Sequence, residues 1–151
     1  MGKQKTVTLS SVFPAAAEDV WQRLQQISTL QYIAKPFVIF TPLDQDLTWL
    51  AGREFRFRLF VFGFIPIGIH VIRIEEFSAD GGYRIQTREH DPFMPVWNHL
   101  ITLEPMGEKT RYTDHVIMQA RCFHGAALLW ARLFYRHRQQ RWLKLLKKAA
   151  V

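Results

Sequence analysis

The chain has 151 residues, of which 48% are hydrophobic and 14% aromatic, so it can bury a core and is not an intrinsically disordered chain. Its formal net charge of +7 makes nucleic acids and anionic membranes partners to consider, but no nucleic-acid-reading module is visible and we expect no nucleic-acid binding. The single cysteine, Cys122, excludes a disulfide within the chain and is expected to be a small buried hydrophobic residue.

The first part of the chain predicts one strand followed directly by two helices. Residues 6–13 alternate in character, as in a strand, and residues 15–27 predict a helix with one apolar face. That face carries Val20, Trp21, Leu24 and Ile27. Ser28 would cap a second short helix, residues 28–33, that ends before Pro36.

The middle of the chain predicts six further strands, because apolar and polar residues alternate there. The predicted strands span residues 37–40, 53–62, 66–77, 83–90, 96–103 and 110–122. Short connections between them, such as Gly81-Gly82, imply that neighbouring strands are antiparallel.

The last segment, residues 123–150, predicts one long helix, because it contains no proline and its apolar residues recur at helical spacing. These residues are Trp130, Leu133, Phe134, Trp142, Leu145, Leu146 and Ala149, and His137 and Arg141 interrupt the stripe. No repeat or linker is visible, so we expect a single domain over residues 1–151.

This order of elements predicts an α+β fold in which a curved antiparallel sheet of about seven strands wraps around the long C-terminal helix. The long helix is large enough to cover one face of the sheet. A helix laid across a curved sheet leaves a gap at one end, which the two short helices would close. We expect that gap to be a pocket for a small hydrophobic molecule.

Three motifs resemble those of the START/polyketide cyclase-like (SRPBCC) helix-grip superfamily, in an order that spans nearly the whole chain. They are Phe13-Pro14 leading into a helix with Val20-Trp21, the run Val96-Trp97-Asn98-His99, and the pattern Gly107-x-x-Thr110-x-x-x-Asp114 before the last strand. The resemblance implies a helix-grip fold and a START-like ligand-binding domain. It also implies a cavity for lipids, sterols, polyketides or other hydrophobic molecules, which some members cyclise or dehydrate.

His99 and Asp114 are the candidate catalytic residues. If the hairpin around Gly107 pairs residues whose numbers sum to about 215, both lie on the same apolar face as Trp97 and Tyr112. A buried carboxylate needs a partner, which an imidazole can supply. The two residues are therefore either an acid–base or ligand-orienting pair in the pocket, or a structural pair.

We expect the ligand to contact residues from several strands and from the long helix. These residues are Phe57, His70, Trp97, His99, Tyr112, Asp114, Trp130 and Phe134. His70 has apolar neighbours and is either a cavity residue or a satisfied core histidine. Glu89 either projects inward near the pocket mouth or is a rim carboxylate paired with an arginine.

No pattern indicates a metal, a cofactor or a hydrolase. The six histidines form no helical i, i+4 pair, no glycine-rich phosphate loop is present, and no serine lies in a nucleophile elbow. We therefore expect neither a cofactor nor a metal.

Two segments are candidates for contacts with partners. The apolar turn of residues 62–67 is either exposed, as a dimer or membrane contact, or packed under a helix. The second segment, from Arg132 to Lys148, contains Lys and Arg residues but no Asp or Glu. Such a basic helix end fits either a solvated face or a weak contact with anionic lipid. The lack of a signal-peptide pattern and of a membrane-spanning apolar run predicts a cytoplasmic location.

Three functions fit the sequence. The first is binding or transport of a small hydrophobic molecule such as a lipid or polyketide. The second is catalysis of the polyketide cyclase/aromatase or dehydratase type, and the third is interaction with a membrane or a protein partner. Binding is preferred over catalysis because no sharp catalytic constellation is present, and the question of an enzyme stays open.

Overall fold

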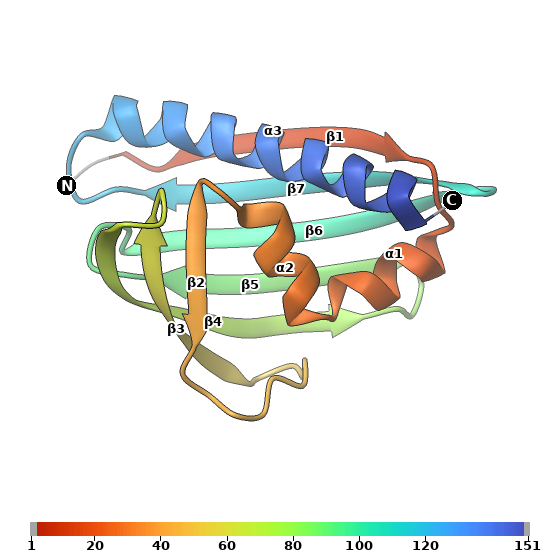
Figure 1. Ribbon diagram of the computed structural model, residues 1–151, viewed down its shortest axis with the longest axis horizontal. Coiled ribbons are helices and arrows are strands. Elements are labelled where there is room, and N and C mark those ends of the chain that lie inside the picture. Colours follow the sequence, from red (N-terminus) through yellow and green to blue (C-terminus); the bar gives the residue numbers. More distant parts are fainter. Residues whose placement is uncertain (1–2, 150–151) are drawn as a thin grey trace.

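An antiparallel sheet and three helices make up residues 3–149, the part of the chain that a computed structural model describes (Figure 1). In chain order the elements are β1 (Lys5–Phe13), α1 (Ala17–Leu24), α2 (Ile27–Ala34), β2 (Val38–Pro42), β3 (Glu54–Val61), β4 (Ile65–Ser78), β5 (Tyr83–His90), β6 (Val96–Met106), β7 (Lys109–Gln119) and α3 (His124–Ala149). Within this range, no helix has both the length and the apolar character needed to cross a membrane.

The sheet has seven strands in the order β1-β7-β6-β5-β4-β3-β2, and each strand is antiparallel to its neighbours. Strands β2 to β7 therefore form a meander, and β1 pairs with β7 to complete the sheet. The predicted α+β fold, with a curved antiparallel sheet and a long C-terminal helix, is confirmed (Figure 1).

The two short helices differ from the prediction at their boundary. The first helix ends at Leu24 rather than continuing, and Ile27 already belongs to α2. Gln26 between them has an extended backbone, so the chain turns there. The predicted cap at Ser28 is wrong, because the N-cap of α2 is Gln26 and it forms no side-chain capping bond.

The buried face of the long helix agrees only in part with the predicted one, sharing Phe134, Trp142 and Leu146 with it. Its buried residues are Ala131, Phe134, Tyr135, Gln139, Trp142 and Leu146, whereas Leu133 is 46% exposed and Ala149 is exposed. The prediction followed apolar residues only and missed that polar side chains occupy the inner face. The predicted end of the helix at Ala150 lies outside the described residues.

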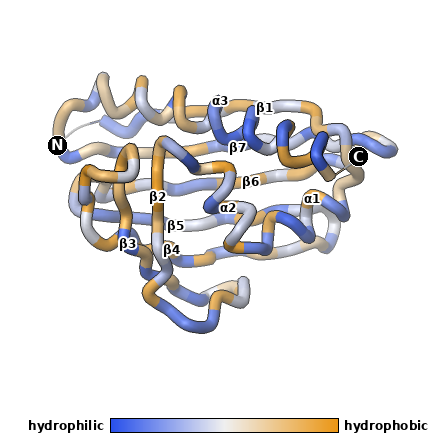
Figure 2. Tube along the Cα trace, viewed as in Figure 1, coloured by the Kyte–Doolittle hydropathy of each residue, from blue (hydrophilic) through white to orange (hydrophobic). Residues whose placement is uncertain are grey.

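Helix and sheet pack directly against each other near α1. Trp142 of α3 is fully buried, and its ring centroid lies 5.6 Å from that of Phe13 and 5.8 Å from that of Tyr112. Val20 and Trp21 of α1 belong to the same core cluster. Toward the first turns of α3, where the helix and the β3–β4 hairpin are rich in hydrophobic residues (Figure 2), the sheet and the helix enclose the cavity described below.

A β-bulge in β4 changes which side chains face the core. The pairing of β4 with β5 shifts between Ile74 and Glu76. His70, Ile72 and Ile74 have the same parity, whereas Phe77 has the opposite parity and yet packs against the same core cluster as Ile74. The bulge thus lets His70 and Phe77 both serve the concave face, which alternation along the strand does not predict.

Candidate ligand-binding site

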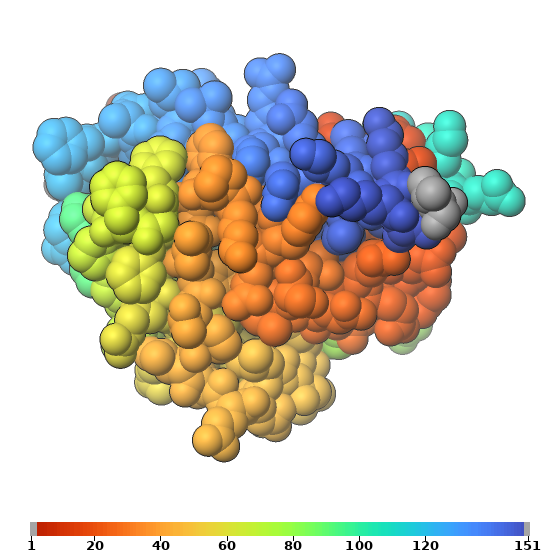
Figure 3. Space-filling view, viewed as in Figure 1, coloured from red at the N-terminus to blue at the C-terminus, as the bar shows by residue number. Residues whose placement is uncertain are grey.

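A mostly apolar cavity of about 460 Å³ lies between the sheet and the helices α2 and α3. Phe55 and Phe57 of β3, Trp97 of β6, and Trp130 and Phe134 of α3 line it. Atoms of β2, α2 and α3 cover this face of the sheet in the space-filling view (Figure 3). Cavities of about 300–1,000 Å³ with mainly apolar walls are typical of sites for small molecules.

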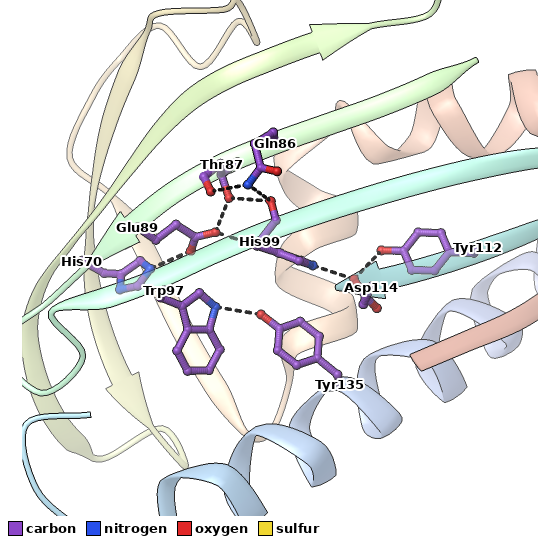
Figure 4. Close-up of polar contacts among 9 residues, drawn as sticks. All are labelled: His70, Gln86, Thr87, Glu89, Trp97, His99, Tyr112, Asp114 and Tyr135. Carbon is purple, nitrogen blue, oxygen red and sulfur yellow. Dashed lines mark hydrogen bonds and ion pairs between the residues drawn. The ribbon is translucent and has the colours of Figure 1, made fainter. Parts of the chain in front are cut away.

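One wall of the cavity is polar and begins at His70 of β4. Its Nδ1 lies 2.8 Å from Asp91 Oδ2 and its Nε2 lies 2.8 Å from Glu89 Oε1 (Figure 4). Thr87 donates a hydrogen bond of 2.6 Å to the other Glu89 oxygen. The register brings these groups together, because His70 and Glu89 lie on neighbouring antiparallel strands. Glu89 therefore projects inward, one of the two orientations that the sequence allowed.

Both ring nitrogens of His70 face carboxylates, so the ring is held as an imidazolium ion. Burial alone would lower the pKa of His70, but the hydrogen bonds to Asp91 and Glu89 outweigh it and raise the pKa to about 9. Burial would likewise raise the pKa of Glu89, but the hydrogen bond and positive charge of His70 hold it below its ordinary value. The two groups thus stabilise each other as an ion pair.

The second polar group of the wall is the pair of His99 and Asp114. The predicted register is confirmed, since His99 lies opposite Val116 and Ile101 opposite Asp114. His99 Nε2 is 2.7 Å from Asp114 Oδ1, and the other ring nitrogen is 4.0 Å from Glu89 Oε2. His99 thus stands between the two carboxylates (Figure 4).

Asp114 is fully buried and is held by donors from several elements. Gln139 of α3 donates a hydrogen bond of 3.0 Å to Asp114 Oδ2, and the Gln139 side chain also contacts Ser11 and the Leu9 carbonyl of β1. Burial would raise the pKa of Asp114, but the hydrogen bond to His99 and the nearby positive charges lower it. An ionised Asp114 accepts only, so His99 Nε2 carries a proton and donates a hydrogen bond to Asp114, while Nδ1 is directed toward Glu89.

Helix α3 adds Tyr135 and Arg138 to the cavity wall. Trp97 Nε1 donates a hydrogen bond of 2.8 Å to the Tyr135 hydroxyl (Figure 4). Burial raises the pKa of Tyr135 well above its ordinary value, so this phenol keeps its proton. The Arg138 guanidinium lies 5.3 Å from the Tyr135 ring centroid and 5.7 Å from that of Phe134.

Six of the eight residues expected to contact the ligand line the cavity. They are Phe57, His70, Trp97, His99, Trp130 and Phe134. Tyr112 and Asp114 do not line it, because both are fully buried where α3 packs directly on the sheet. This corrects the expectation for these two residues, and Asp114 can act on a ligand only through His99.

The sequence prediction missed Asp91, Tyr135, Arg138 and Gln139. Asp91 follows β5 and seemed to be an ordinary loop residue, yet it is buried and accepts hydrogen bonds from the Phe93 and Met94 amides. The three helix residues share the face of Trp142 at spacings of three, four and seven residues. That spacing is the signal that could have identified them.

The cavity meets the surface where the β5–β6 and β7–α3 loops adjoin, at residues Phe93, Cys122 and Phe123, which are exposed and line it. Cys122 is therefore not the buried hydrophobic residue that we expected, because β7 ends before it at Gln119. The loops are neighbours, since Arg121 donates to the carbonyls of Phe93 and Pro92.

Exposed apolar residues lie in the loops at this opening and in the β3–β4 turn, whose flanking residues Val61 and Ile67 also line the cavity. We call these exposed residues the entrance rim. They are Phe62, Phe64, Ile65, Phe93 and Phe123. Phe62 and Phe123 both have φ of 54°, in the left-handed region that bulky residues rarely adopt. The apolar turn of residues 62–67 therefore has exposed side chains, as in the first of the two alternatives that the sequence left open, and is not packed under a helix. Among residues 3–149, no group of three or more His, Cys, Asp or Glu side chains is placed to hold a metal ion.

Comparison with known proteins shows where this fold occurs. The Zhui aromatase/cyclase from Streptomyces sp. R1128 is similar, with a TM-score of 0.77 and 13% identity over 99% of this chain and 97% of that chain. A START superfamily protein from Mycobacterium smegmatis has a TM-score of 0.75 and 11% identity over 95% of this chain and 98% of the other. Ara h 8.0201 has a TM-score of 0.63 and 9% identity over 94% and 99% of the two chains.

Comparison with curated proteins gives no significant match. A model of the family described as "Domain of unknown function (DUF8410)" matches residues 11–146, which is most of the chain. The chain therefore belongs to this family, DUF8410, and its fold is the helix-grip fold of the START/polyketide cyclase-like (SRPBCC) superfamily.

Proposed function

We propose that residues 1–151 form one START-like domain that binds a small hydrophobic molecule in the cavity between the sheet and α3. The observation that carries this proposal is the cavity itself, which has a volume of about 460 Å³ and mainly apolar walls. Its polar groups lie on the wall around His70, Glu89 and His99 and on the facing helix at Tyr135 and Arg138, where they would orient a ligand. Apolar burial would supply most of the binding energy.

The fold supports this proposal. Proteins with the same fold include a START superfamily protein and an aromatase/cyclase. The family resemblance of the sequence motifs implies a lipid or a polyketide as the kind of molecule to test. The identities of 11% and 13% are too low to transfer a particular ligand.

The test combines native mass spectrometry with a neutral dye, N-phenyl-1-naphthylamine, which fluoresces in apolar sites. We expect the gently purified protein either to carry a hydrophobic compound or to bind the dye in a one-to-one ratio. Ala127→Phe places a ring into the cavity that Ala127 lines and should abolish binding. Ala79→Phe, in the exposed β4–β5 turn, is the control and should bind normally. Equal binding by both variants would contradict the proposal.

A second candidate function, catalysis of the cyclase/aromatase or dehydratase type, is favoured by His99. Its ring lines the cavity, Asp114 holds one nitrogen, and the other is directed toward Glu89 rather than bonded to it. A neutral imidazole in this position can take a proton from a carbon next to a carbonyl group, which is the first step of an aldol-type ring closure.

This candidate is tested by proton exchange at the activated carbon of a bound ketone. The protein is mixed with 2-tetralone in D₂O, and NMR follows the loss of its α-protons. His99→Gln should abolish the acceleration, whereas His115→Gln, whose side chain contacts Thr8 on β1, should retain it. Exchange at the uncatalysed rate with the wild-type protein would exclude this kind of proton transfer for the probe.

We also propose that the entrance rim contacts an anionic membrane surface. Phe64 is 74% exposed and Phe123 is 80% exposed, so both can enter the headgroup region of a bilayer. The segments that form the rim, residues 59–69, 92–95 and 119–138, contain no Asp or Glu, and Arg121 and Arg132 are exposed beside it. This combination of apolar tips and basic neighbours complements anionic lipid.

A further inference from the structure

Helix α3 presents several hydrogen-bond donors to the cavity that have no acceptor in the described part of the chain. Tyr135 accepts a hydrogen bond from Trp97 Nε1, and no acceptor among residues 3–149 takes the Tyr135 phenolic proton. Arg138, one turn further along α3, forms neither a hydrogen bond nor an ion pair with any described residue, and its Nε is buried. Trp130 Nε1 is a third buried donor without a partner in the described part of the chain.

The carboxylate oxygens of the cavity, by contrast, are all engaged. Glu89 accepts from His70 through one oxygen and from Thr87 through the other. Asp91 accepts from His70 through Oδ2 and from the Phe93 and Met94 amides through Oδ1. These carboxylate oxygens thus already have donors, whereas a ligand that brought an acceptor would satisfy buried donors that have no partner among residues 3–149.

The charges around the cavity select among acceptors. Three carboxylates, those of Glu89, Asp91 and Asp114, face two cations at neutral pH, His70 and Arg138. When His99 is neutral, one negative charge is thus left unbalanced. A ligand carboxylate would add a further buried charge of the same sign, and this is costly in an apolar cavity. An uncharged carbonyl oxygen avoids this cost.

We propose that Tyr135 and Arg138 form a subsite for the carbonyl oxygen of an uncharged, otherwise apolar ligand. The two side chains stand one turn apart on the cavity face of α3, and the two lone pairs of a carbonyl oxygen match their two donors. The inference rests on the proposed ligand-binding function and names the class of ligand: a ketone, an ester or a quinone-like compound with an apolar skeleton.

Three rigid compounds of nearly equal shape test the inference: 9-fluorenone, which has the carbonyl group, fluorene, which lacks it, and fluorene-9-carboxylate. Affinities are measured by displacement of N-phenyl-1-naphthylamine. We expect fluorenone to bind about tenfold more tightly than fluorene, and the carboxylate to bind most weakly. The infrared carbonyl band of bound fluorenone should shift to lower frequency, which reports the hydrogen bond without reference to affinity.

Tyr135→Phe and Arg138→Met should each remove most of the preference for fluorenone and reverse the infrared shift. The matched control is Arg136→Met, because Arg136 is exposed on the same helix and should leave both readouts unchanged. Circular dichroism confirms that the variants are folded, and retained fluorene binding shows that their cavity is intact.

Two outcomes would overturn the inference in distinguishable ways. If fluorene and fluorenone bind equally and the carbonyl band is unshifted, or if the carboxylate binds most tightly, the carbonyl subsite is wrong while the ligand-binding function stands. If neither the dye nor any of the three compounds binds, the proposed function fails and this inference fails with it.

Discussion

Both ring nitrogens of His70 face carboxylates, so this residue couples the stability of the fold to pH. Its pKa is raised from an ordinary value of 6.5 to about 9 in the folded state. A group whose pKa is raised on folding stabilises the protein fully below its unfolded pKa, and the contribution is lost as pH rises through the folded pKa. The stabilisation from His70 is therefore present below pH 6.5 and disappears toward pH 9 and above.

The first prediction is that the free energy of unfolding falls by about 3 kcal/mol between pH 6.5 and pH 10, and that His70→Gln removes most of this fall. The side chain of His70 is 12% exposed, so screening by water is weak. Urea denaturation at a series of pH values measures the effect. His115→Gln, at the exposed contact with Thr8, is the control and should keep the wild-type slope. An unchanged slope in His70→Gln would contradict the assignment.

Asp114 stabilises the fold through its hydrogen bonds with buried partners. We predict that Asp114→Ala lowers the free energy of unfolding by about 3–5 kcal/mol, because it leaves His99 Nε2 as a buried donor without an acceptor and removes one of the two acceptors of Gln139. Urea denaturation at neutral pH measures the loss. Thr113→Ala, which removes only a surface hydrogen bond to Ser10, should cost no more than about 1 kcal/mol. Similar losses in both variants would show that the buried network contributes little.

At the scale of elements, alternation and spacing located the helices and strands but not all of their faces. The β6–β7 register followed from the sequence, because the turn at Gly107 fixes which residues are opposite each other. The β4 bulge between Ile74 and Glu76 did not, since no residue type announces it. The inner face of α3 was predicted only in part, because Gln139 and Arg138 are polar. The contact of Gln139 with Asp114 across the fold explains its place there, and Arg138 packs beside Tyr135 on the same helix.

Phe123, just before α3, has a left-handed backbone conformation that is unfavourable for a bulky residue. Phe123 is 80% exposed, has φ of 54°, and its carbonyl accepts the first helical hydrogen bond, from Ala127. An asparagine tolerates the left-handed conformation and is favoured at helix N-caps. The exposed phenyl ring thus does not stabilise the fold, which is consistent with a role in contact with a membrane.

We therefore predict that Phe123→Asn stabilises the protein by about 1 kcal/mol and weakens its binding to anionic vesicles by about tenfold. Urea denaturation and vesicle flotation at low salt measure the two effects. Met106→Asn makes the same chemical change at an exposed site next to a turn glycine in the β6–β7 hairpin, at the opposite end of the molecule, and should leave vesicle binding unchanged (Figure 1). No flotation of the wild-type protein would exclude the membrane contact, and a dimer in sedimentation would assign the rim to a second copy.

At the scale of the whole molecule, the sequence predicted that a cavity exists but could not predict its polar wall. Element order indicated a gap between a curved sheet and one long helix. The wall depends on residues far apart in sequence, such as His70 with Asp91 and Asp114 with Gln139, whose side chains meet only after the sheet closes under α3. Pairing of this kind depends on register, bulges and helix rotation together.

An unfilled cavity lowers the stability of the fold, so a substitution that fills it should affect stability and ligand binding in opposite directions. Side chains around a void lose packing contacts, at a cost of about 20–25 cal/mol per Å³ of cavity in measured cases. We predict that Ala127→Phe, which fills part of the volume of about 460 Å³, raises the free energy of unfolding by about 1–2 kcal/mol while it abolishes ligand binding. Urea denaturation of the ligand-free protein measures the first effect and dye titration the second. Ala79→Phe should change neither, since Ala79 is exposed. If Ala127→Phe lost both stability and binding, the ring would be forcing apart a packed core, and the space between α3 and the sheet would not be a binding cavity.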